Sequence, residues 1–155
     1  MTSRIDLTKT APAAFEALRG LENYVHRSDL PKSLVTLVKL HASYLNRCAY
    51  CVDMHTKDAR AAGETEQRLY AVPVWREAPY FSERERAAFA WSELVTQLPP
   101  AGIPDSAYDA ARREFSEREL ADLTVVLLAI NAWNRLKAAF GGEVGTYQPK
   151  HRPAA

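Results

Sequence analysis

The sequence lacks features that identify several large classes of protein. Among its 155 residues there are only two cysteines, which excludes a scaffold held together by many disulfides. No apolar run approaches the roughly 20 residues of a membrane span, and the N-terminus lacks the apolar core of a signal peptide. The formal net charge of +1 predicts neither a nucleic acid nor a membrane as a partner. A cytoplasmic location is therefore expected by default.

The sequence also lacks any segment that alternates apolar and polar residues for long enough to form a sheet, although Tyr70 to Trp75 has a weakly extended character. Apolar residues instead recur every three or four positions. A chain of this length that is 47% hydrophobic and 25% charged can bury one core. We predict an all-α fold, a compact bundle of about seven helices in a single domain over residues 1–142. Residues 143–155 are expected to form a loose C-terminal tail.

Caps and breaks predict where the helices begin and end. Thr10 is the expected N-cap of the first helix. A capping box with an aromatic residue before it occurs twice, as Phe81-Ser82-Glu83-Arg84-Glu85 and as Phe115-Ser116-Glu117-Arg118-Glu119. Gly63 and the pair Gly141-Gly142 are expected to end helices. The predicted helices cover about residues 11–27, 31–45, 48–62, 65–71, 83–97, 105–113 and 117–140.

The most specific feature is the pair Cys48 and Cys51, with His55 four residues after the second cysteine. If a helix begins at about Cys48, these spacings place all three side chains on one face. Unpaired N–H groups and the dipole at a helix N-terminus favour a thiolate, and C-x-x-C cysteines there have lowered pKa values. One sulfur can then attack a substrate while the other resolves the product as a disulfide.

Three other interpretations of the cysteines stay open. They can be buried and inert on a core helix, since cysteine is often buried. With His55 they supply three zinc ligands, although a closed structural site needs four and no second C-x-x-C follows. They can also form the disulfide of a secreted protein, although the chain is large enough to fold without one. The redox interpretation is preferred, and it requires neither a metal nor a cofactor.

The segment from Leu37 to Gly63 resembles the core motif of the AhpD-like alkylhydroperoxidases, within the carboxymuconolactone decarboxylase superfamily. The resemblance continues through Trp75-Arg76-Glu77 and Phe81 to Ala88, so that it covers residues 32–96 well. It implies an all-helical fold and homo-oligomers built by packing helices. It also implies that the two cysteines reduce a hydroperoxide and that a dithiol reductant then reopens their disulfide.

One position departs from this family's pattern. The family's proton relay uses a glutamate twelve residues before the first cysteine, and here that position is Thr36. His55 could act as the base alone or through water. The candidates to complete the relay are Glu83, Glu85, His41 and Tyr50. Helix capping is a sufficient explanation of Glu85. His41 lies on an apolar face, where a histidine is more often a core residue, and Tyr50 can simply pack.

Asn131 and Asn134 on the last predicted helix repeat the spacing of the cysteines, and Asn131 follows Glu119 by twelve residues. This pattern is either a remnant of an internal duplication or a pair of core amides that are hydrogen-bonded between helices.

Three functions therefore stay open. In the first, Cys51 is deprotonated by His55 and attacks a hydroperoxide, and Cys48 resolves the sulfenic acid. In the second, the chain is a carboxymuconolactone decarboxylase-type enzyme, in which acid–base residues carry the reaction and no cysteine pair is needed. In the third, it is an oligomeric binding or stress protein with vestigial peroxidase activity, which the loss of glutamate at position 36 would fit.

Overall fold

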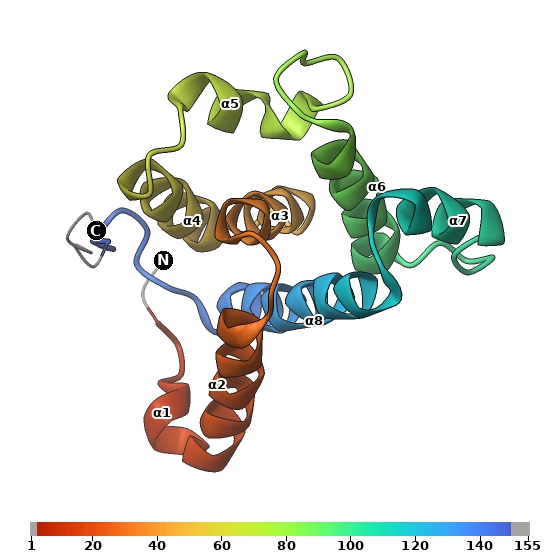
Figure 1. The fold of residues 1–155 in the computed structure, drawn as a ribbon. Helices are drawn as coiled ribbons and strands as arrows, with labels where there is room; N and C mark the ends of the chain where they lie inside the picture. Colours follow the sequence, from red (N-terminus) through yellow and green to blue (C-terminus); the bar gives the residue numbers. More distant parts are fainter. Residues whose placement is uncertain (1–2, 150–155) are drawn as a thin grey trace.

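The computed structural model describes residues 3–149, and this part of the chain consists of helices and connecting loops without a strand (Figure 1). The predicted all-α fold is confirmed. Within the described residues, no helix combines the length and the apolar character needed to cross a membrane. The elements are α1 (Leu7–Thr10), α2 (Pro12–Arg27), α3 (Lys32–Leu45), α4 (Ala49–Ala61), α5 (Glu66–Ala71), the 3-10 helix η1 (Val72–Val74), α6 (Glu83–Gln97), α7 (Asp105–Glu114) and α8 (Glu117–Phe140).

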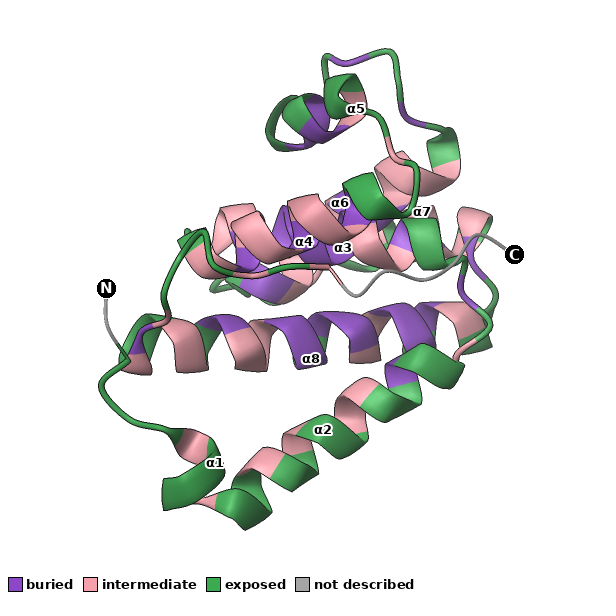
Figure 2. Ribbon diagram, turned by 90° about the vertical axis from the view of Figure 1, so that its left-hand side faces the viewer, coloured by how far each residue is buried: buried purple, intermediate pink, exposed green. Residues whose placement is uncertain are grey.

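Helix α3 lies at the centre of the molecule and packs against α4, α6 and α8 (Figure 1). A quarter-turn view shows α8 beneath this layer and α2 crossing below α8 (Figure 2). The larger core cluster lies between α3 and α8, where Val38, Leu123, Val126 and Leu127 are fully buried. Because α3 carries apolar residues at three- and four-residue spacing, one continuous stripe of it can enter this core.

A second core cluster lies under the arch formed by α5, η1 and the loop that leads to α6 (Figure 1). The ring of Phe89 is its centre, with Trp75 at 5.7 Å and Phe81 at 5.1 Å between ring centroids. Both of these loop residues are buried within a single chain. The stretch whose sequence has a weakly extended character is helical in the structure from Tyr70 to Val74, in α5 and η1, and Trp75 is the C-cap of η1.

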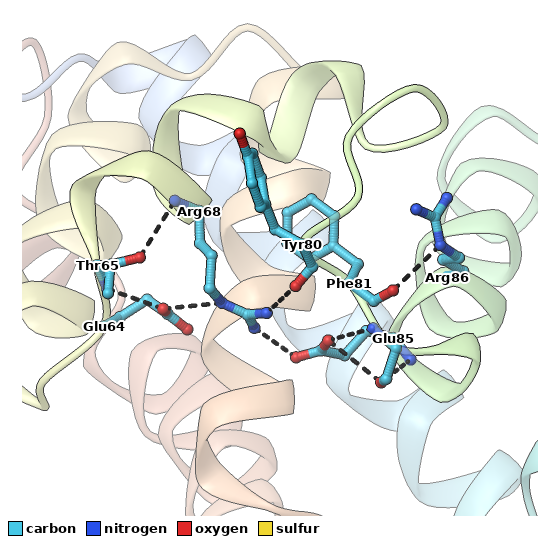
Figure 3. A network of polar contacts seen from close by, with 8 residues as sticks. Glu64, Thr65, Arg68, Tyr80, Phe81, Glu85 and Arg86 are labelled. Carbon is cyan, nitrogen blue, oxygen red and sulfur yellow. Dashed lines mark hydrogen bonds and ion pairs between the residues drawn. The ribbon is translucent and has the colours of Figure 1, made fainter.

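The side chain of Arg68 forms hydrogen bonds that connect this arch to the start of α6 (Figure 3). Its guanidinium donates hydrogen bonds to Glu64 Oε1 at 2.9 Å, to Glu85 Oε1 at 2.6 Å and to the backbone carbonyl of Tyr80. The second carboxylate oxygen of Glu85 accepts from the Ser82 backbone N–H at 2.8 Å, which completes the predicted capping box. The predicted capping box at Ser116 and Glu119 is also present.

Two details at the N-terminal end differ from the sequence-based expectations. Residues Leu7–Thr10 form the short helix α1, and the N-cap of α2 is Ala11 instead of Thr10. The described part of the predicted loose tail, residues 143–149, is coil that is hydrogen-bonded to α4. There Tyr147 donates to Asp58 at 2.7 Å, and Lys57 donates to the Gly145 carbonyl at 3.0 Å. Residues 150–155 lie outside the described residues.

Candidate active site

The two cysteines lie where α3 connects to α4, and the backbone makes a tight turn at this connection. Arg47 has a φ of 54°, which reverses the chain direction after α3. The Cys48 N–H donates to the carbonyl of Ser43 at 3.0 Å, so Cys48 is tied to the last turn of α3. Cys48 is the N-cap of α4, and Cys51 lies in the first turn of that helix. The predicted helix start is therefore correct to within one residue.

Amide side chains from α8 stabilise this turn by hydrogen bonds. The Asn46 side chain donates to Asn131 Oδ1 at 2.8 Å and to Asn134 Oδ1 at 2.9 Å. Asn134, which is 1% exposed, donates in return to Ser43 Oγ at 3.2 Å. Asn131 and Asn134 are thus core amides hydrogen-bonded between helices, as the second of the two interpretations held.

Cys48 and Cys51 form a disulfide in the structure. Both residues are almost fully buried, with 6% of Cys48 and 2% of Cys51 exposed. Across residues 3–149, no group of three or more histidine, cysteine, aspartate or glutamate side chains is arranged to hold a metal ion. The arrangement can carry thiol–disulfide exchange, in which two electrons are stored by breaking the S–S bond.

His55 lies one turn after Cys51 on the same helix and is 7% exposed. Burial, with the positive charge of Lys39 acting in the same direction, lowers the pKa of His55 to about 3. Its Nε2 is buried and has no hydrogen-bond partner among the described residues. His55 is therefore neutral at physiological pH, with a side-chain nitrogen that is not already engaged.

Sequence reasoning missed a buried ion pair between α2 and α3, whose lysine charge acts on the pKa of this histidine. Lys39 lies on the buried side of α3, is 6% exposed, and its Nζ pairs with Glu22 Oε1 of α2. The other carboxylate oxygen, Glu22 Oε2, is buried without a partner in the described chain. The sequence signal was a lysine inside the apolar run from Leu37 to Leu40, where a charge is costly unless it is paired.

Thr36, at the position of the family's relay glutamate, uses its hydroxyl within its own helix. Thr36 Oγ1 donates to the Lys32 carbonyl at 2.8 Å. The residue lines a pocket of about 310 Å³ between the start of α3 and the end of α4, together with Leu37, Ala59 and Gly63. This pocket lies toward the opposite end of α4 from Cys48.

His41 belongs to a separate cluster. Its Nε2 lies 3.3 Å from Glu93 Oε1 without the alignment of a hydrogen bond, and its ring packs 5.1 Å from that of Phe89. Burial lowers the pKa of His41, against the opposing effect of Glu93. Burial raises the pKa of Glu93, but hydrogen bonds from Arg76 and Trp75 outweigh it, and the pKa lies below its usual value.

The remaining relay candidates also have other partners. The carboxylate of Glu85 is held by Arg68 and Ser82, and Glu83 lies 4.0 Å from Arg86. The ring of Tyr50 packs under the Lys137 ammonium at 4.2 Å. Among the described residues, none of these contacts involves the cysteines or His55.

Comparisons with known proteins identify relatives of this chain. The sequence model of the carboxymuconolactone decarboxylase family matches residues 10–94. The chain is 36% identical over 146 residues to the uncharacterized protein YdfG of Bacillus subtilis strain 168, which covers 94% of this chain and 99% of the relative.

Two solved structures are similar as well. An Agrobacterium tumefaciens protein of unknown function, suggested to be the antioxidant defence protein AhpD, is 42% identical with a TM-score of 0.89, over 94% of this chain and 100% of that one. The alkylhydroperoxidase AhpD core of an uncharacterized peroxidase-related protein from Ralstonia eutropha JMP134 is 19% identical with a TM-score of 0.79, over 90% of this chain and 74% of that one. At that identity the second similarity concerns the fold alone.

Proposed function

The chain belongs to the carboxymuconolactone decarboxylase family, and we propose that it is a thiol-dependent hydroperoxidase of the AhpD type. The observation that carries this proposal is the disulfide of Cys48 and Cys51 at the start of α4, one turn before a neutral, buried histidine. An antioxidant role suggested for the similar Agrobacterium tumefaciens protein supports it.

The proposed reaction begins with the reduced pair. His55 accepts the proton of the Cys51 thiol, and the thiolate attacks the distal oxygen of the hydroperoxide. A sulfur–oxygen bond forms while the O–O bond breaks, and the leaving alkoxide takes up a proton to become an alcohol. The sulfur is oxidised to a sulfenic acid, and the peroxide is reduced.

The second cysteine completes the turnover. The Cys48 sulfur attacks Cys51, which forms the disulfide and releases the sulfenic oxygen as water. A dithiol reductant then exchanges with this disulfide, so that the reductant is oxidised and both thiols are restored. Cys48 is the sulfur at the helix N-cap, the end of α4 at which we expect the reductant to approach.

We do not propose the decarboxylase reaction after which the family is named. That chemistry depends on acid–base residues and does not need a redox pair. The disulfide, which closes the C-x-x-C at the start of α4, argues for the thiol reaction.

Thiol counting tests the proposal. The two thiols of the reduced chain should be lost when an organic hydroperoxide is added, and one equivalent of alcohol should form per chain. The double variant Cys48→Ser with Cys51→Ser has no thiol and serves as the control for non-enzymatic decay of the peroxide. If the wild-type thiol count does not change, the protein is not a hydroperoxidase.

A further inference from the structure

Side-chain hydrogen bonds connect helix α8 to the turn that carries Cys48. Asn46 is the C-cap of α3 and lies two residues before Cys48. Its side-chain amide donates to the Oδ1 atoms of Asn131 and Asn134 on α8, and to the Ala42 carbonyl on α3. Because a primary amide has two N–H groups, both donors of Asn46 are engaged.

These hydrogen bonds continue to the backbone of Cys48 itself. Asn134 donates to the hydroxyl of Ser43, and the Ser43 carbonyl accepts the N–H of Cys48. Ser43 is 0% exposed and Asn134 is 1% exposed. Groups this deeply buried cannot exchange their partners for water, so a single arrangement of the turn is favoured.

A third helix fixes the orientation of Asn131. Its Nδ2 donates to Thr96 Oγ1 of α6 at 3.1 Å and to the Leu127 carbonyl at 2.9 Å. Its Oδ1 accepts from Arg135 at 2.8 Å as well as from Asn46. The turn before α4 is therefore held by α6 and α8, and neither helix carries a cysteine.

The position of Cys48 depends on this turn more than the position of Cys51 does. Cys51 lies within the first turn of α4, whereas Cys48 is the N-cap and has a non-helical backbone conformation. The Cys48 N–H is bonded to Ser43, which lies outside α4. The Cα atoms of the two cysteines are 5.3 Å apart, within the range that a disulfide can span.

We propose that Asn46 and Asn134 are positioning residues that hold Cys48 close to Cys51 in the reduced protein. None of their side-chain hydrogen bonds in the described chain involves a sulfur, so they act through the backbone of the turn. Holding two reacting groups in place raises their effective concentration. The S–S bond should therefore form faster and be harder to reduce than in a chain with a loose turn.

Two reactions use this arrangement. In the first, the Cys48 thiol attacks the Cys51 sulfenic acid, the S–S bond forms and the S–O bond breaks, and the hydroxide leaves with the thiol proton as water. In the second, the two thiols exchange with glutathione disulfide, which is reduced to two glutathione thiols while the protein pair is oxidised. The inference rests on the proposed function for the first reaction alone, because the second needs no peroxide.

Equilibration of the full-length protein with glutathione buffers measures the effective concentration. Alkylation of the free thiols and mass spectrometry give the ratio of reduced to oxidised protein. In Asn46→Ala and in Asn134→Ala, the equilibrium constant for disulfide formation should fall by about tenfold, which corresponds to a reduction potential about 30 mV less negative.

A second readout separates the two halves of the peroxide reaction. Both variants should consume the first equivalent of organic hydroperoxide at the wild-type rate, because Cys51 and His55 lie outside the amide hydrogen bonds. Closure of the disulfide should be about tenfold slower, so that dimedone traps more sulfenic acid. A general loss of structure would instead slow both halves.

Thr124→Val on α8 is the matched control. Thr124 Oγ1 accepts from the indole N–H of Trp91 on α6 at 3.0 Å, so this variant also removes a hydrogen bond between α6 and α8. It should leave the glutathione equilibrium and both halves of the peroxide reaction unchanged. If Asn134→Ala does not fold, the half-buried Asn46 still gives a variant that decides.

A wild-type equilibrium constant in folded Asn46→Ala or Asn134→Ala would overturn the positioning role. So would an equal decrease in Thr124→Val, because the effect would then follow any loss of helix packing. If the wild-type protein does not consume hydroperoxide, the proposed function fails, and the glutathione equilibrium still tests the two amides.

Discussion

At the residue scale, the two sulfurs differ in their distance from the base along α4. Cys51 precedes His55 by four residues, which is one helical turn, whereas Cys48 precedes it by seven. Cys51→Ser should therefore abolish reaction with hydroperoxide. Cys48→Ser should react once and stop at a sulfenic acid, which dimedone traps. Stopped-flow kinetics and mass spectrometry measure the two outcomes, and a trapped sulfenic acid in Cys51→Ser instead would reverse the roles.

His55→Ala should slow the first step by about 10²-fold, because a positioned general base is lost. The loss should be largest below neutral pH, where too little thiolate forms unaided. The pH profile of single-turnover peroxide reduction measures it. His26→Ala, on the exposed side of α2, is the matched control and should follow the wild-type profile. An unchanged profile in His55→Ala would remove the histidine from the mechanism.

The same histidine makes stability depend on pH. Its pKa is lowered from 6.5 to about 3 in the folded chain, mainly by burial. Between these values the unfolded chain binds a proton that the folded chain does not, so the free energy of unfolding falls as pH falls. The contribution of His55 is fully present above pH 6.5 and is lost as pH drops toward 3. Urea unfolding between about pH 4 and pH 6 should have a pH slope about 1.4 kcal/mol per unit steeper in wild type than in His55→Gln. Parallel slopes would contradict this.

At the scale of elements, the turn between α3 and α4 depends on α8. Asn134 accepts from Asn46 and donates to Ser43, whose carbonyl holds the Cys48 N–H. Asn134→Ala leaves the buried Ser43 hydroxyl and the half-buried Asn46 amide with fewer partners, so the free energy of unfolding should fall by about 1–3 kcal/mol. Asn23→Ala, on the exposed face of α2, is the control and should change it by less than about 0.5 kcal/mol. Denaturant titration measures the free energy of unfolding of both variants. Equal decreases in the two variants would contradict a stabilising role of this hydrogen-bond network.

At the scale of the whole molecule, we propose that the chain assembles into a homo-oligomer in solution. Trp75 and Phe81 are buried inside the single chain, so their side chains are not exposed for contact between subunits. Large side chains that are exposed instead are Tyr70 at 70%, Val74 at 60% and Leu128 at 53%. Sedimentation velocity at micromolar concentration should give a mass of two or more times the 17.4 kDa of one chain. A monomer under these conditions would contradict the proposal.

Much of the fold could be predicted from the sequence because its signals act over short distances. Helix caps, apolar spacing of three and four residues, and glycines at helix ends are local, so most helix boundaries were correct to within one or two residues. Cys48, Cys51 and His55 were also predictable as a set, since a helix fixes the spacing of residues that are one turn apart. The short helix α1 was missed because its four residues carry no apolar repeat.

Contacts between helices were decided only by the tertiary structure. The relay candidates chosen from the sequence are held by other partners: Glu85 by Arg68, His41 next to Glu93, and Tyr50 under Lys137. Lys39 and Glu22 lie 17 residues apart on different helices, and nothing in helical periodicity relates two such positions. Their pairing follows from the angle at which α2 and α3 meet, because the buried ammonium needs a carboxylate and only the packing of helices determines which one reaches it.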